Sequence, residues 1–315
     1  MYQMKITALQ GPLVSIVVIT FNSSSTVIET LNSLLVQNYE PLELIVCDDA
    51  SSDNTVEIIR NWEKENFYKF NKVTIIAHSV NQGICKNVAG GYSHADGEWI
   101  KPIAGDDILL PGAIVSYMEM VNDSACSVIV SKVTPFTSSS AISNSQEDMI
   151  PNAMNSSIIA GEPEILLKTL HYQNIIPGPG IILKRSDYEE IAGIDERFYH
   201  LDDWPLWINF LKKGKKICWL PKSLVGYRIS SETVSASKNS TRVNVNFLQD
   251  HITFYENYQI NNINRIFRFD RALEIFRFKL AKGILRDFPR FYRFTGIIRF
   301  ISPLYLKNFL VKKLS

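Results

Sequence analysis

The sequence of 315 residues predicts a protein of the α/β class, built on a mostly parallel sheet flanked by helices. Two patterns predict this class. Apolar runs of strand length alternate with segments whose apolar residues recur at helical spacing, which implies right-handed crossovers between parallel strands. Polar residues follow directly after four of the apolar runs, and the ligands of parallel sheets bind at the edge where the strands end.

The first strand is expected at residues 14–20, because their continuous apolar run is typical of a central strand covered on both faces. A helix follows, with apolar residues at helical spacing from Val27 to Leu35. Further strands are expected at 42–47, 73–77 and 99–103, with helices around 56–62 and at 84–95. The polar residues at the four strand ends are Thr20 to Asn22, Asp48 and Asp49, Asn81 to Lys86, and Asp106 and Asp107.

The second half of the chain alternates less regularly. Strands are expected at 128–132, 181–184, 216–220 and 224–229, and helices at 163–170, 207–211 and 244–259. Residues 137–157 are rich in Ser and Asn without periodicity, so we expect a loop there, either a mobile lid beside the site or a passive insertion. Residues 177–180, Pro-Gly-Pro-Gly, predict a turn that shapes the backbone.

Residues 97–112, GEWIKPIAGDDILLPG, carry two adjacent carboxylates, Asp106 and Asp107, directly after an apolar strand. Carboxylates at the end of a buried strand are costly unless they are neutralised. A divalent cation with a phosphorylated ligand would neutralise them, because hard cations share oxygen ligands with phosphates. The alternative is an ordinary turn or helix cap, with Pro111 in the first turn of the next helix.

A second acidic pair, Asp202 and Asp203, precedes the apolar helix expected at 207–211. Carboxylates at a helix start satisfy unpaired backbone N–H groups and oppose the helix dipole. The pair is therefore either a helix cap or the place of a general base set near the metal.

The formal net charge of +1 conceals an uneven distribution. Residues 265–315 contain 13 Lys and Arg and 3 Asp and Glu, a net charge of +10, whereas the remaining 264 residues carry −9. The tail also contains many aromatic residues, and Phe291, Phe294, Ile298 and Ile301 would share one helical face. A basic amphipathic helix of this kind favours an anionic membrane surface. The alternatives are a helical subdomain packed on the body or in a homodimer; the body contains nothing that supports nucleic-acid binding.

The four cysteines, Cys47, Cys85, Cys126 and Cys218, are far apart and form no CxxC pair. They are expected to be reduced thiols of a cytoplasmic protein, neither a disulfide framework nor a zinc site. The amino-terminal residues lack the pattern of an export signal, and no apolar window is long enough to span a bilayer. We therefore expect a cytoplasmic protein that associates peripherally with the inner face of the cell membrane.

Seven motifs occur in the order typical of one enzyme family: VSIVVITFN, LELIVCDDASSDNT, NQGICKN, ADGEWIKPIAGDD, GIDERF, LDDWPLW and LVGYRI. Over residues 14–235 the chain resembles the family 2 inverting glycosyltransferases, which have the GT-A fold. The resemblance implies a catalytic domain at residues 1–240, with a nucleotide-sugar half at about 12–110 and an acceptor half at about 111–240. Residues 241–315 would then form a basic, helical extension.

The resemblance also implies roles for individual residues. Contacts to the nucleotide sugar are expected from Thr20, Phe21, Asn22, Asp49, Asn81, Gly83, Lys86, Gly105 and Asp106. Within this set Thr20 and Phe21 line the base and Asp49 accepts a hydrogen bond from it. Lys86 faces the base or the phosphates. Contacts to the acceptor are expected from Asp107, Gly180 and Trp204, although Asp107 has the alternative of supporting Asp106 from behind and Trp204 that of core packing.

The metal-binding DxD motif of the family falls on residues 104–106, so Asp106 is the expected ligand of Mn²⁺ or Mg²⁺. Two positions depart from the family pattern. Ala104 replaces the first carboxylate, and Ser230 stands where many members have a histidine. Metal binding is therefore expected to depend on the diphosphate of the donor. Asp203, with Asp202 beside it, falls on the position of the catalytic base.

The expected activity is transfer of a hexose, with inversion, from a UDP sugar to a lipid-linked acceptor of the undecaprenyl diphosphate GlcNAc type. Such a reaction belongs to the synthesis of bacterial surface polysaccharide, either O-antigen (lipopolysaccharide) or capsule. Ala104 and Ser230 motivate the alternative of a non-catalytic partner subunit that only binds nucleotide sugar, and Asp203 argues against it. A nucleotidyltransferase or dinucleotide-binding protein is disfavoured, because no glycine-rich phosphate loop follows the first strand.

Overall fold

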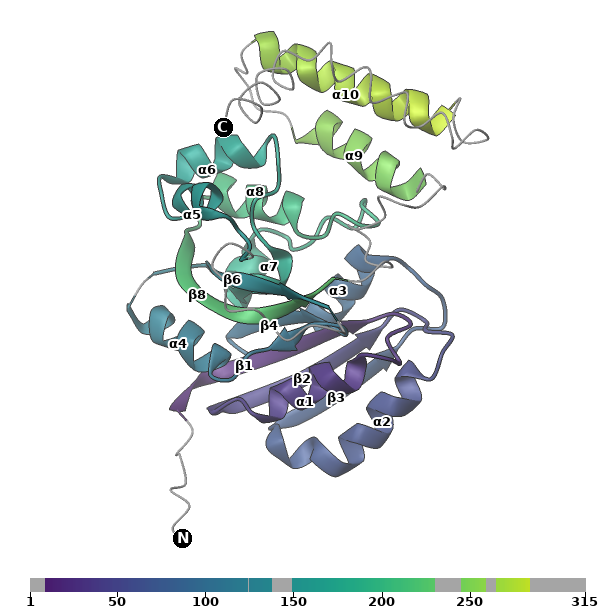
Figure 1. Cartoon of the computed structure of the whole chain (residues 1–315), viewed down its shortest axis with the longest axis vertical. Coiled ribbons are helices and arrows are strands. Elements are labelled where there is room, and N and C mark those ends of the chain that lie inside the picture. Colours follow the sequence, from purple (N-terminus) through teal and green to yellow (C-terminus); the bar gives the residue numbers. More distant parts are fainter. Residues whose placement is uncertain (1–8, 124, 138–148, 230–244, 259–264, 284–315) are drawn as a thin grey trace. The chain divides into compact units, whose positions relative to one another are not determined.

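The computed structural model describes residues 9–123, 125–137, 149–229, 245–258 and 265–283 (Figure 1). The chain divides into two compact units, residues 1–196 with 202–230 and residues 197–201 with 231–315. The domain boundary expected at residue 240 falls outside the described residues, and so does Ser230.

The described part of the larger unit contains one sheet with the strand order β3-β2-β1-β4-β7-β6-β8-β5. The strands are β1 (Leu9–Thr20), β2 (Tyr39–Asp48), β3 (Lys72–Ala77), β4 (Trp99–Ala104), β5 (Ile108–Leu109), β6 (Val128–Phe136), β7 (Ile181–Lys184) and β8 (Ile217–Arg228). The four neighbours β3, β2, β1 and β4 are parallel, so their carboxyl ends meet at one edge. β7 is antiparallel to β4 and β6, whereas β6 and β8 are parallel. The predicted mostly parallel sheet is confirmed.

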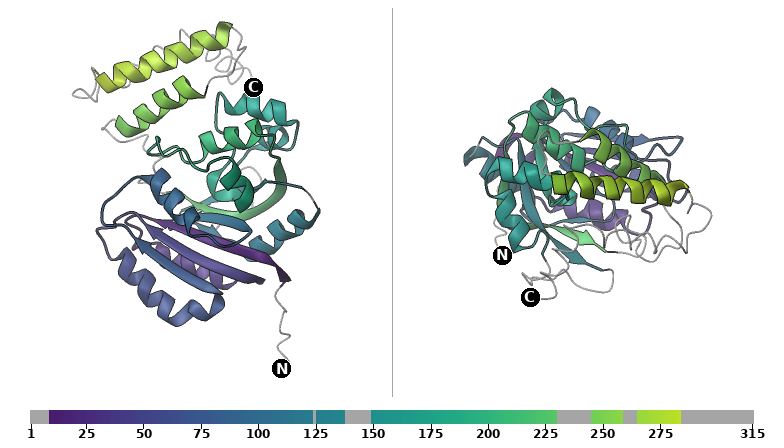
Figure 2. Two further views of the ribbon diagram at one scale, coloured as in Figure 1. Left: turned by 180° about the vertical axis from the view of Figure 1, so that it is seen from behind. Right: turned by 90° about the horizontal axis from the view of Figure 1, so that it is seen from above.

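Helices cover both faces of this sheet. They are α1 (Val27–Leu35), α2 (Thr55–Asn66), η1 (Phe67–Lys69), α3 (Ile84–Ser93), α4 (Ala113–Asp123), α5 (Ala153–Ile159), α6 (Pro163–Leu170), η3 (Gly178–Gly180), α7 (Arg185–Glu190) and α8 (Trp204–Lys212). Apolar residues of α1, α2 and α4 share a core with Ile16 and Val18 of β1. Val17 points the other way, toward Gly91 of α3, and is equally buried. Figure 2 shows helices on both faces of the sheet. The central strand is thus covered on both faces, as its apolar run predicts.

The two closing strands expected at 216–220 and 224–229 are a single strand, β8. Its pairing with β6 jumps from Leu220 to Ser223, which leaves Pro221 and the residue after it outside the ladder. Proline has no N–H to donate to a ladder, so it is tolerated where a strand bulges. The strand therefore bulges at the proline and does not end there.

The second part of the expected loop at 137–157 is helical. Residues 138–148 lie outside the described residues, but α5 begins directly after Asn152. The Asn152 side chain accepts a hydrogen bond from the backbone N–H of Asn155 at 2.9 Å, which caps the helix. A helix of seven residues is too short to show apolar periodicity, and the cap was the usable signal.

The helix after the acidic pair of residues 106 and 107 begins later than expected. Pro111 lies in the preceding turn and α4 starts at Ala113. Gly112 between them has a φ of 75°, a left-handed conformation that favours glycine. The proline thus shapes the turn and is not part of the first helical turn.

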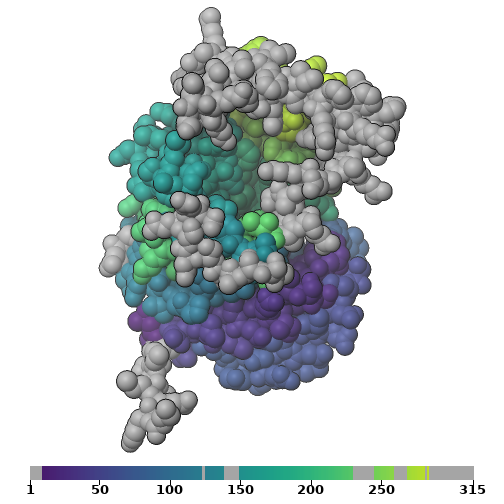
Figure 3. Space-filling view, viewed as in Figure 1, coloured from purple at the N-terminus to yellow at the C-terminus, as the bar shows by residue number. Residues whose placement is uncertain are grey.

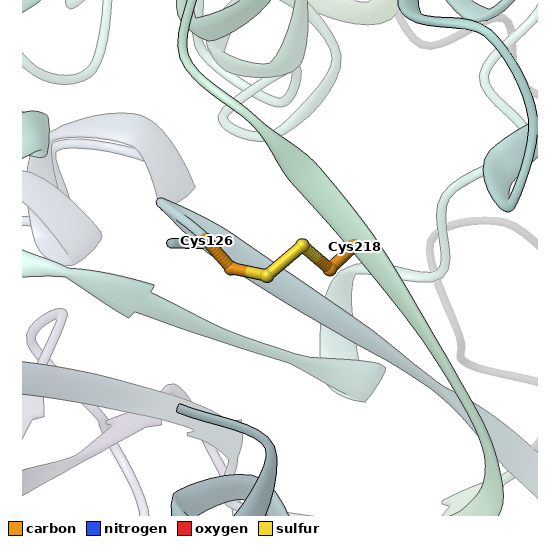
Figure 4. The surroundings of a disulfide bond; sticks show 2 residues. All are labelled: Cys126 and Cys218. Atoms are coloured by element: carbon orange, nitrogen blue, oxygen red, sulfur yellow. A yellow bond between two sulfur atoms is a disulfide. The ribbon is translucent and has the colours of Figure 1, made fainter. Parts of the chain in front are cut away.

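The expectation of four reduced cysteines is wrong for two of them. Cys126 and Cys218 form a disulfide, with their Cα atoms 6.0 Å apart, although 92 residues separate them in the sequence (Figure 4). The parallel pairing of β6 with β8 brings them together, because Cys218 lies opposite Ile129 in the register. Sequence spacing carries no trace of this pairing. Cys47 and Cys85 lie outside this disulfide and are buried.

We expect oxidised protein, alkylated after unfolding, to take up two alkyl groups, and protein reduced beforehand to take up four. Intact-mass spectrometry measures this difference directly. Closing a loop of this length restricts the unfolded chain, so reduction is also expected to lower the free energy of unfolding by about 2–4 kcal/mol. A Cys126→Ser/Cys218→Ser variant should be insensitive to reductant; four alkyl groups without reduction would contradict the disulfide.

The smaller unit contains α9 (Val245–Asn257) and α10 (Arg265–Gly283), which pack together through Leu248, Ile252 and Phe278. The carboxylate of Asp250 accepts hydrogen bonds from the backbone N–H groups of Tyr199 and His200, so residues 197–201 belong to this unit. The apolar face predicted at residues 291–301 lies outside the described residues. No described helix combines the length and apolarity needed to cross a membrane.

Candidate functional site

The ends of β1 and β2 are held together by the buried carboxylate of Asp48. It accepts hydrogen bonds from Thr20 Oγ1 at 2.7 Å and from the N–H of Ser51 at 2.8 Å. Thr20 is 1% exposed, so its hydroxyl fixes the strand end. Asn22, with a φ of 50°, accepts from the N–H of Ser52 at 2.9 Å. These bonds fix the loop that carries Phe21.

Asp49 joins the same edge to the start of α3. Its two carboxylate oxygens accept from the backbone N–H groups of Gln82 at 2.7 Å and Gly83 at 2.9 Å. Gly83 has a φ of 91°, which places the loop of Asn81 beside Asp49. A carboxylate oxygen has two lone pairs, so Asp49 keeps the capacity to accept from a base. The structure therefore brings together Thr20, Asp49 and Gly83 of the expected nucleotide-binding residues.

Phe21 and Lys86 are the exposed members of the expected nucleotide set at this edge, together with Asn22. The Phe21 side chain is 50% exposed at the end of the central strand, although an aromatic ring is normally buried. An exposed ring held by a rigid loop offers a stacking surface for a base.

We expect Phe21→Ala to weaken UDP binding by about tenfold, because aromatic stacking on a base contributes about 1–3 kcal/mol. The free energy of unfolding should change little, since the ring is half exposed. Titration calorimetry with UDP and thermal unfolding measure the two effects. Phe67→Ala, which removes another exposed ring from the same unit, is the matched control; equal UDP affinity in both variants would contradict this role of Phe21.

The turn after β4 is fastened to α1 and β1. Thr26 Oγ1 donates to the carbonyl oxygen of Gly105 at 2.8 Å, and Thr30 Oγ1 donates to that of Asp107 at 2.7 Å. A Cβ on Gly105 would lie 2.7 Å from Cγ2 of Thr20. Only glycine permits this close approach. The ends of β1 and β4 are consequently locked side by side, with Asp106 next to the nucleotide edge.

The carboxylate of Asp106 is half-buried, and among the described residues no other residue donates a hydrogen bond to it. Burial raises the pKa of this carboxyl, and the charge of Arg228 opposes the rise. Within the described part of the chain, no group of three acidic, histidine or cysteine side chains surrounds a cation position. Asp106 therefore fits a cation whose other ligands come from a diphosphate, as Mg²⁺ commonly takes.

Asp107 points into the protein. It is 1% exposed, its Oδ1 accepts from the N–H of Arg228 at 2.9 Å, and its Oδ2 has no hydrogen-bond partner in the described part of the chain. Burial and the charge of Asp106 raise the pKa of Asp107 to about 8. Of the two roles expected for Asp107, burial favours support of Asp106 over contact with the acceptor.

Arg228 at the end of β8 was not singled out from the sequence. It is 4% exposed, its Nε donates to the carbonyl oxygen of Asp106 at 2.8 Å, and its guanidinium also bonds Glu29 of α1. The guanidinium carbon lies 4.5 Å above the ring centre of Phe136. A buried planar cation of this kind fixes several elements at once. The motif LVGYRI contains this arginine and was the available signal.

Asp203 directly precedes α8 and lies against η3. Its Oδ2 accepts from Asn174 Nδ2 at 2.8 Å, and a Cβ on Gly178 would lie 3.3 Å from the same oxygen. No side-chain bond from Asp203 caps α8. Burial raises the pKa values of both Asp202 and Asp203, and the charge of Asp203 raises that of Asp202 further. Two adjacent carboxyls with raised pKa values are typical of a general base.

The other two residues expected at the acceptor are buried. Trp204 is 7% exposed and its Nε1 donates to the carbonyl oxygen of Leu170, which favours the core-packing alternative. A Cβ on Gly180 would lie 2.7 Å from the carbonyl oxygen of Ser131, so this glycine lets η3 pack on β6. Both residues are therefore packed inside the half of the unit that is expected to bind the acceptor.

The two acidic sites, at Asp106 and at Asp203, lie in different halves of the larger unit, but a hydrogen bond connects the elements beside them. Figure 3 shows the residues in purple and blue at one end of this unit and the later, teal residues at the other. Lys101 of β4 donates from Nζ to the carbonyl oxygen of Pro179 at 2.8 Å, which joins β4 to η3. Strand β4, which ends two residues before Asp106, is thus bonded to the turn that adjoins Asp203.

The sheet and its acidic edge define a glycosyltransferase domain of the GT-A type. A family model described as "Glycosyl transferase family 2" matches residues 15–191, more than half of the chain, and the chain belongs to this family.

Two curated relatives are similar over most of the chain. One is GalNAc(5)-diNAcBac-PP-undecaprenol beta-1,3-glucosyltransferase of Campylobacter jejuni, 26% identical over 76% of this chain and 72% of the relative. The other is UDP-Glc:alpha-D-GlcNAc-diphosphoundecaprenol beta-1,3-glucosyltransferase WfaP of Escherichia coli, 28% identical over 72% of this chain and 81% of the relative. Both relatives are named for glucosyl transfer to undecaprenol-linked saccharides.

Solved structures support the fold. A mannosyltransferase of Pyrobaculum calidifontis, in complex with GDP-Man and Mn²⁺, has a TM-score of 0.61 at 14% identity, over 96% of this chain and 81% of the other. Residues 1–349 of Staphylococcus aureus TarS, in complex with UDP-GlcNAc, have a TM-score of 0.59 at 16% identity, over 85% of this chain and 72% of the other. At this identity the likeness shows the fold alone.

Proposed function

We propose that this chain transfers a hexose, with inversion, from a UDP sugar to an undecaprenyl diphosphate-linked acceptor in the synthesis of a bacterial surface polysaccharide. The observation that carries the proposal is the bonded connection between two acidic sites of different character. No other described residue donates a hydrogen bond to the carboxylate of Asp106, at the edge proposed to bind the nucleotide, and Asp203 has a raised pKa beside η3. The two glucosyltransferase relatives support the UDP-glucose donor and the lipid-linked acceptor.

In this reaction the acceptor hydroxyl loses its proton to Asp203 while its oxygen bonds to the anomeric carbon of the donor. The bond from that carbon to the diphosphate breaks on the opposite side, and UDP leaves with the electron pair. Attack from the opposite side inverts the anomeric centre. Asn174 donates to Oδ2 of Asp203 and so orients the carboxylate. A raised pKa improves a carboxylate as a proton acceptor near neutral pH.

The residues present fit a divalent cation of the Mn²⁺ or Mg²⁺ class. Asp106 would hold it together with the donor diphosphate, and Asp107 and Arg228 would support Asp106 from behind. When bound, such a cation stabilises the negative charge that develops on the leaving diphosphate. The single available carboxylate implies that the cation and the donor bind together, since each supplies part of the other's site.

A screen of nucleotide sugars with Mn²⁺ and a synthetic GlcNAc-diphosphate-lipid acceptor tests the proposal. We expect turnover of UDP-glucose or UDP-galactose, with a β linkage in the product from the α-linked donor. Wild-type protein that binds UDP but consumes no donor with any lipid-linked acceptor would refute the proposal. That result would instead favour a partner subunit that only binds nucleotide sugar.

We also propose that the smaller unit binds an anionic membrane surface, at the inner face of the cell membrane. In α10, Phe269 is 47% exposed and Phe276 is 57% exposed, and their spacing of seven residues places them on one face. Arg268 and Lys279 are exposed on the same helix. Exposed aromatic rings flanked by cations suit a membrane interface.

Sedimentation with vesicles that contain phosphatidylglycerol tests this second proposal. Phe269→Ala/Phe276→Ala should reduce the bound fraction at low ionic strength, whereas Phe67→Ala/Tyr68→Ala, which removes two exposed rings from the larger unit, should not. Equal sedimentation of both double variants and wild type would exclude α10 as the binding surface.

A further inference from the structure

Lys101 is a lysine in an unusual environment. It lies within β4 and is 0% exposed, although lysine is rarely buried without an ionic partner. Its Nζ donates hydrogen bonds to the carbonyl oxygens of Pro102 and Pro179, the latter at 2.8 Å. Burial lowers the pKa of Lys101 to about 7, and the nearby charge of Asp107 opposes this fall. Removing an ammonium group from water is costly, so its contacts must serve the fold or the site.

The contacts of Lys101 reach the surroundings of both acidic sites. On one side, the positive charge of Lys101 acts to lower the pKa of Asp107, which directly follows Asp106 in the chain. On the other side, Pro179 is the residue after Gly178, whose Cα lies against the carboxylate of Asp203. Pro179 is 78 residues from Lys101 along the chain. One buried side chain therefore joins the donor side to the wall of the acceptor side.

The composition of the turn at residues 177–180 limits the groups through which it can bond to β4. Residues 177–180 contain two prolines, which have no N–H to bond the strand, and two glycines, which allow many backbone conformations. The carbonyl of Pro179 is thus one of few groups through which the turn can be fastened to β4. Without the ammonium, both carbonyl oxygens would lose their donor in a buried place.

We infer that Lys101 is a positioning residue that fastens η3 to β4 and thereby sets the placement of Asp203 relative to Asp106. The inference rests on the proposed glycosyl transfer. Lys101 does not touch the reacting atoms: it acts through the turn at residues 177–180. Its loss should therefore impair the chemical step more than donor binding, because the nucleotide edge is built by other bonds.

The test compares wild type with Lys101→Met, which keeps the chain length and removes the ammonium. We expect kcat to fall by about 30-fold, since a displacement of about 1 Å at a reacting group costs up to a hundredfold. The donor KM and the UDP affinity should stay within about twofold, as expected when an interaction acts only in the transition state. Tyr117→Phe is the matched control. It removes one buried hydrogen bond, between its hydroxyl and Ser131 Oγ at 2.7 Å, and leaves in place the Ser131 carbonyl oxygen that packs against Gly180 of η3.

Hydrogen–deuterium exchange gives a second readout that needs no turnover. In Lys101→Met, peptides that cover residues 174–184 should exchange faster, whereas peptides that cover residues 48–53 should be unchanged. In Tyr117→Phe neither region should change. If wild type transferred no sugar, the proposed function would fail, but the exchange data would still decide whether Lys101 fastens the turn.

Three results would overturn the inference: unchanged exchange at residues 174–184, losses of kcat and donor KM equal to those of Tyr117→Phe, or a parallel loss of UDP binding. Should Lys101→Met fail to fold, Lys101→Gln retains a shorter hydrogen-bond donor and is tested in the same way. Failure of both variants to bind UDP would show that Lys101 serves stability as a whole, which also overturns the inference.

Discussion

Asp203→Asn is expected to lower kcat for sugar transfer by about 10³-fold, within the range of about 10²–10⁴ that a positioned general base contributes. Asparagine has nearly the same shape, and its side-chain oxygen can still accept the hydrogen bond from Asn174. The substitution removes the ability of this side chain to accept a proton and changes little else. UDP affinity should stay within about twofold, because Asp203 adjoins η3 and, among the described residues, no hydrogen bond joins it to Thr20, Asp49 or Gly83.

Glu196→Gln is a suitable control, because it neutralises an exposed carboxylate close to Asp203 in the sequence. Single-turnover measurements with saturating donor separate the chemical step from product release. Full activity of Asp203→Asn would remove the base from the proposed mechanism and leave donor binding as the only supported property of the site.

The pH dependence of kcat should report the raised pKa of the acidic pair. A base acts only when deprotonated, so kcat should fall as the pH drops through a pKa well above that of an ordinary Asp. Burial is the main cause of the raised pKa of Asp203, and the charge of Asp203 acts on Asp202, so Asp202→Asn should leave the acid limb of kcat well above the pKa of an ordinary Asp. Rates between pH 5 and 9 measure the position of this limb. Constant rates over this range in Asp202→Asn would contradict burial as the cause.

Much of the fold could be predicted because its signals are local. The apolar runs of β1, β2 and β4 need no knowledge of their neighbours to be read as buried strands. The Cys126–Cys218 disulfide and the single long strand β8 could not be predicted in this way. Both depend on the pairing of β6 with β8, which joins residues about ninety positions apart. Helix α5 was missed for another reason, since seven residues carry too little periodicity and only the Asn152 cap marks its start.

The residues of the candidate site also differ in whether a local sequence signal marks them. Asp106 and Asp203 could be singled out because acidic pairs after a strand or before a helix are visible in the sequence. Lys101 could not, and Arg228 is marked only by its place in the motif LVGYRI, because a lysine in a strand and an arginine at a strand end are ordinary until their partners are known. Those partners lie 78 and 122 residues away. Sequence patterns thus predict which residues face the substrates, and the structure adds residues that hold those predicted ones in place.

Asp106→Asn should abolish the dependence of UDP binding on Mn²⁺ and lower kcat by about 10²–10³-fold, the effect of removing one electrostatic contribution to the leaving group. The carboxylate has no competing hydrogen-bond donor among the described residues, so its charge is available to a cation. Asparagine keeps the shape and offers a neutral oxygen, which binds a hard cation far more weakly. Titration calorimetry of UDP with Mn²⁺, and again with EDTA, measures the dependence.

The matched control is Asp96→Asn, which neutralises an exposed carboxylate paired with Lys72 before β4 begins. Ala104 replaces the other carboxylate expected in the DxD motif, so residues 104–106 supply one acidic ligand. If Asp106→Asn bound UDP with undiminished Mn²⁺ dependence, the cation would have to be held elsewhere, and the bonds from Arg228 and Thr30 around this turn would serve the fold alone. If the Mn²⁺ dependence of UDP binding disappears while the free energy of unfolding does not fall, those bonds hold Asp106 in place for the cation. The free energy of unfolding should not fall, because a half-buried carboxylate that no other described residue bonds adds no stability that its replacement could remove.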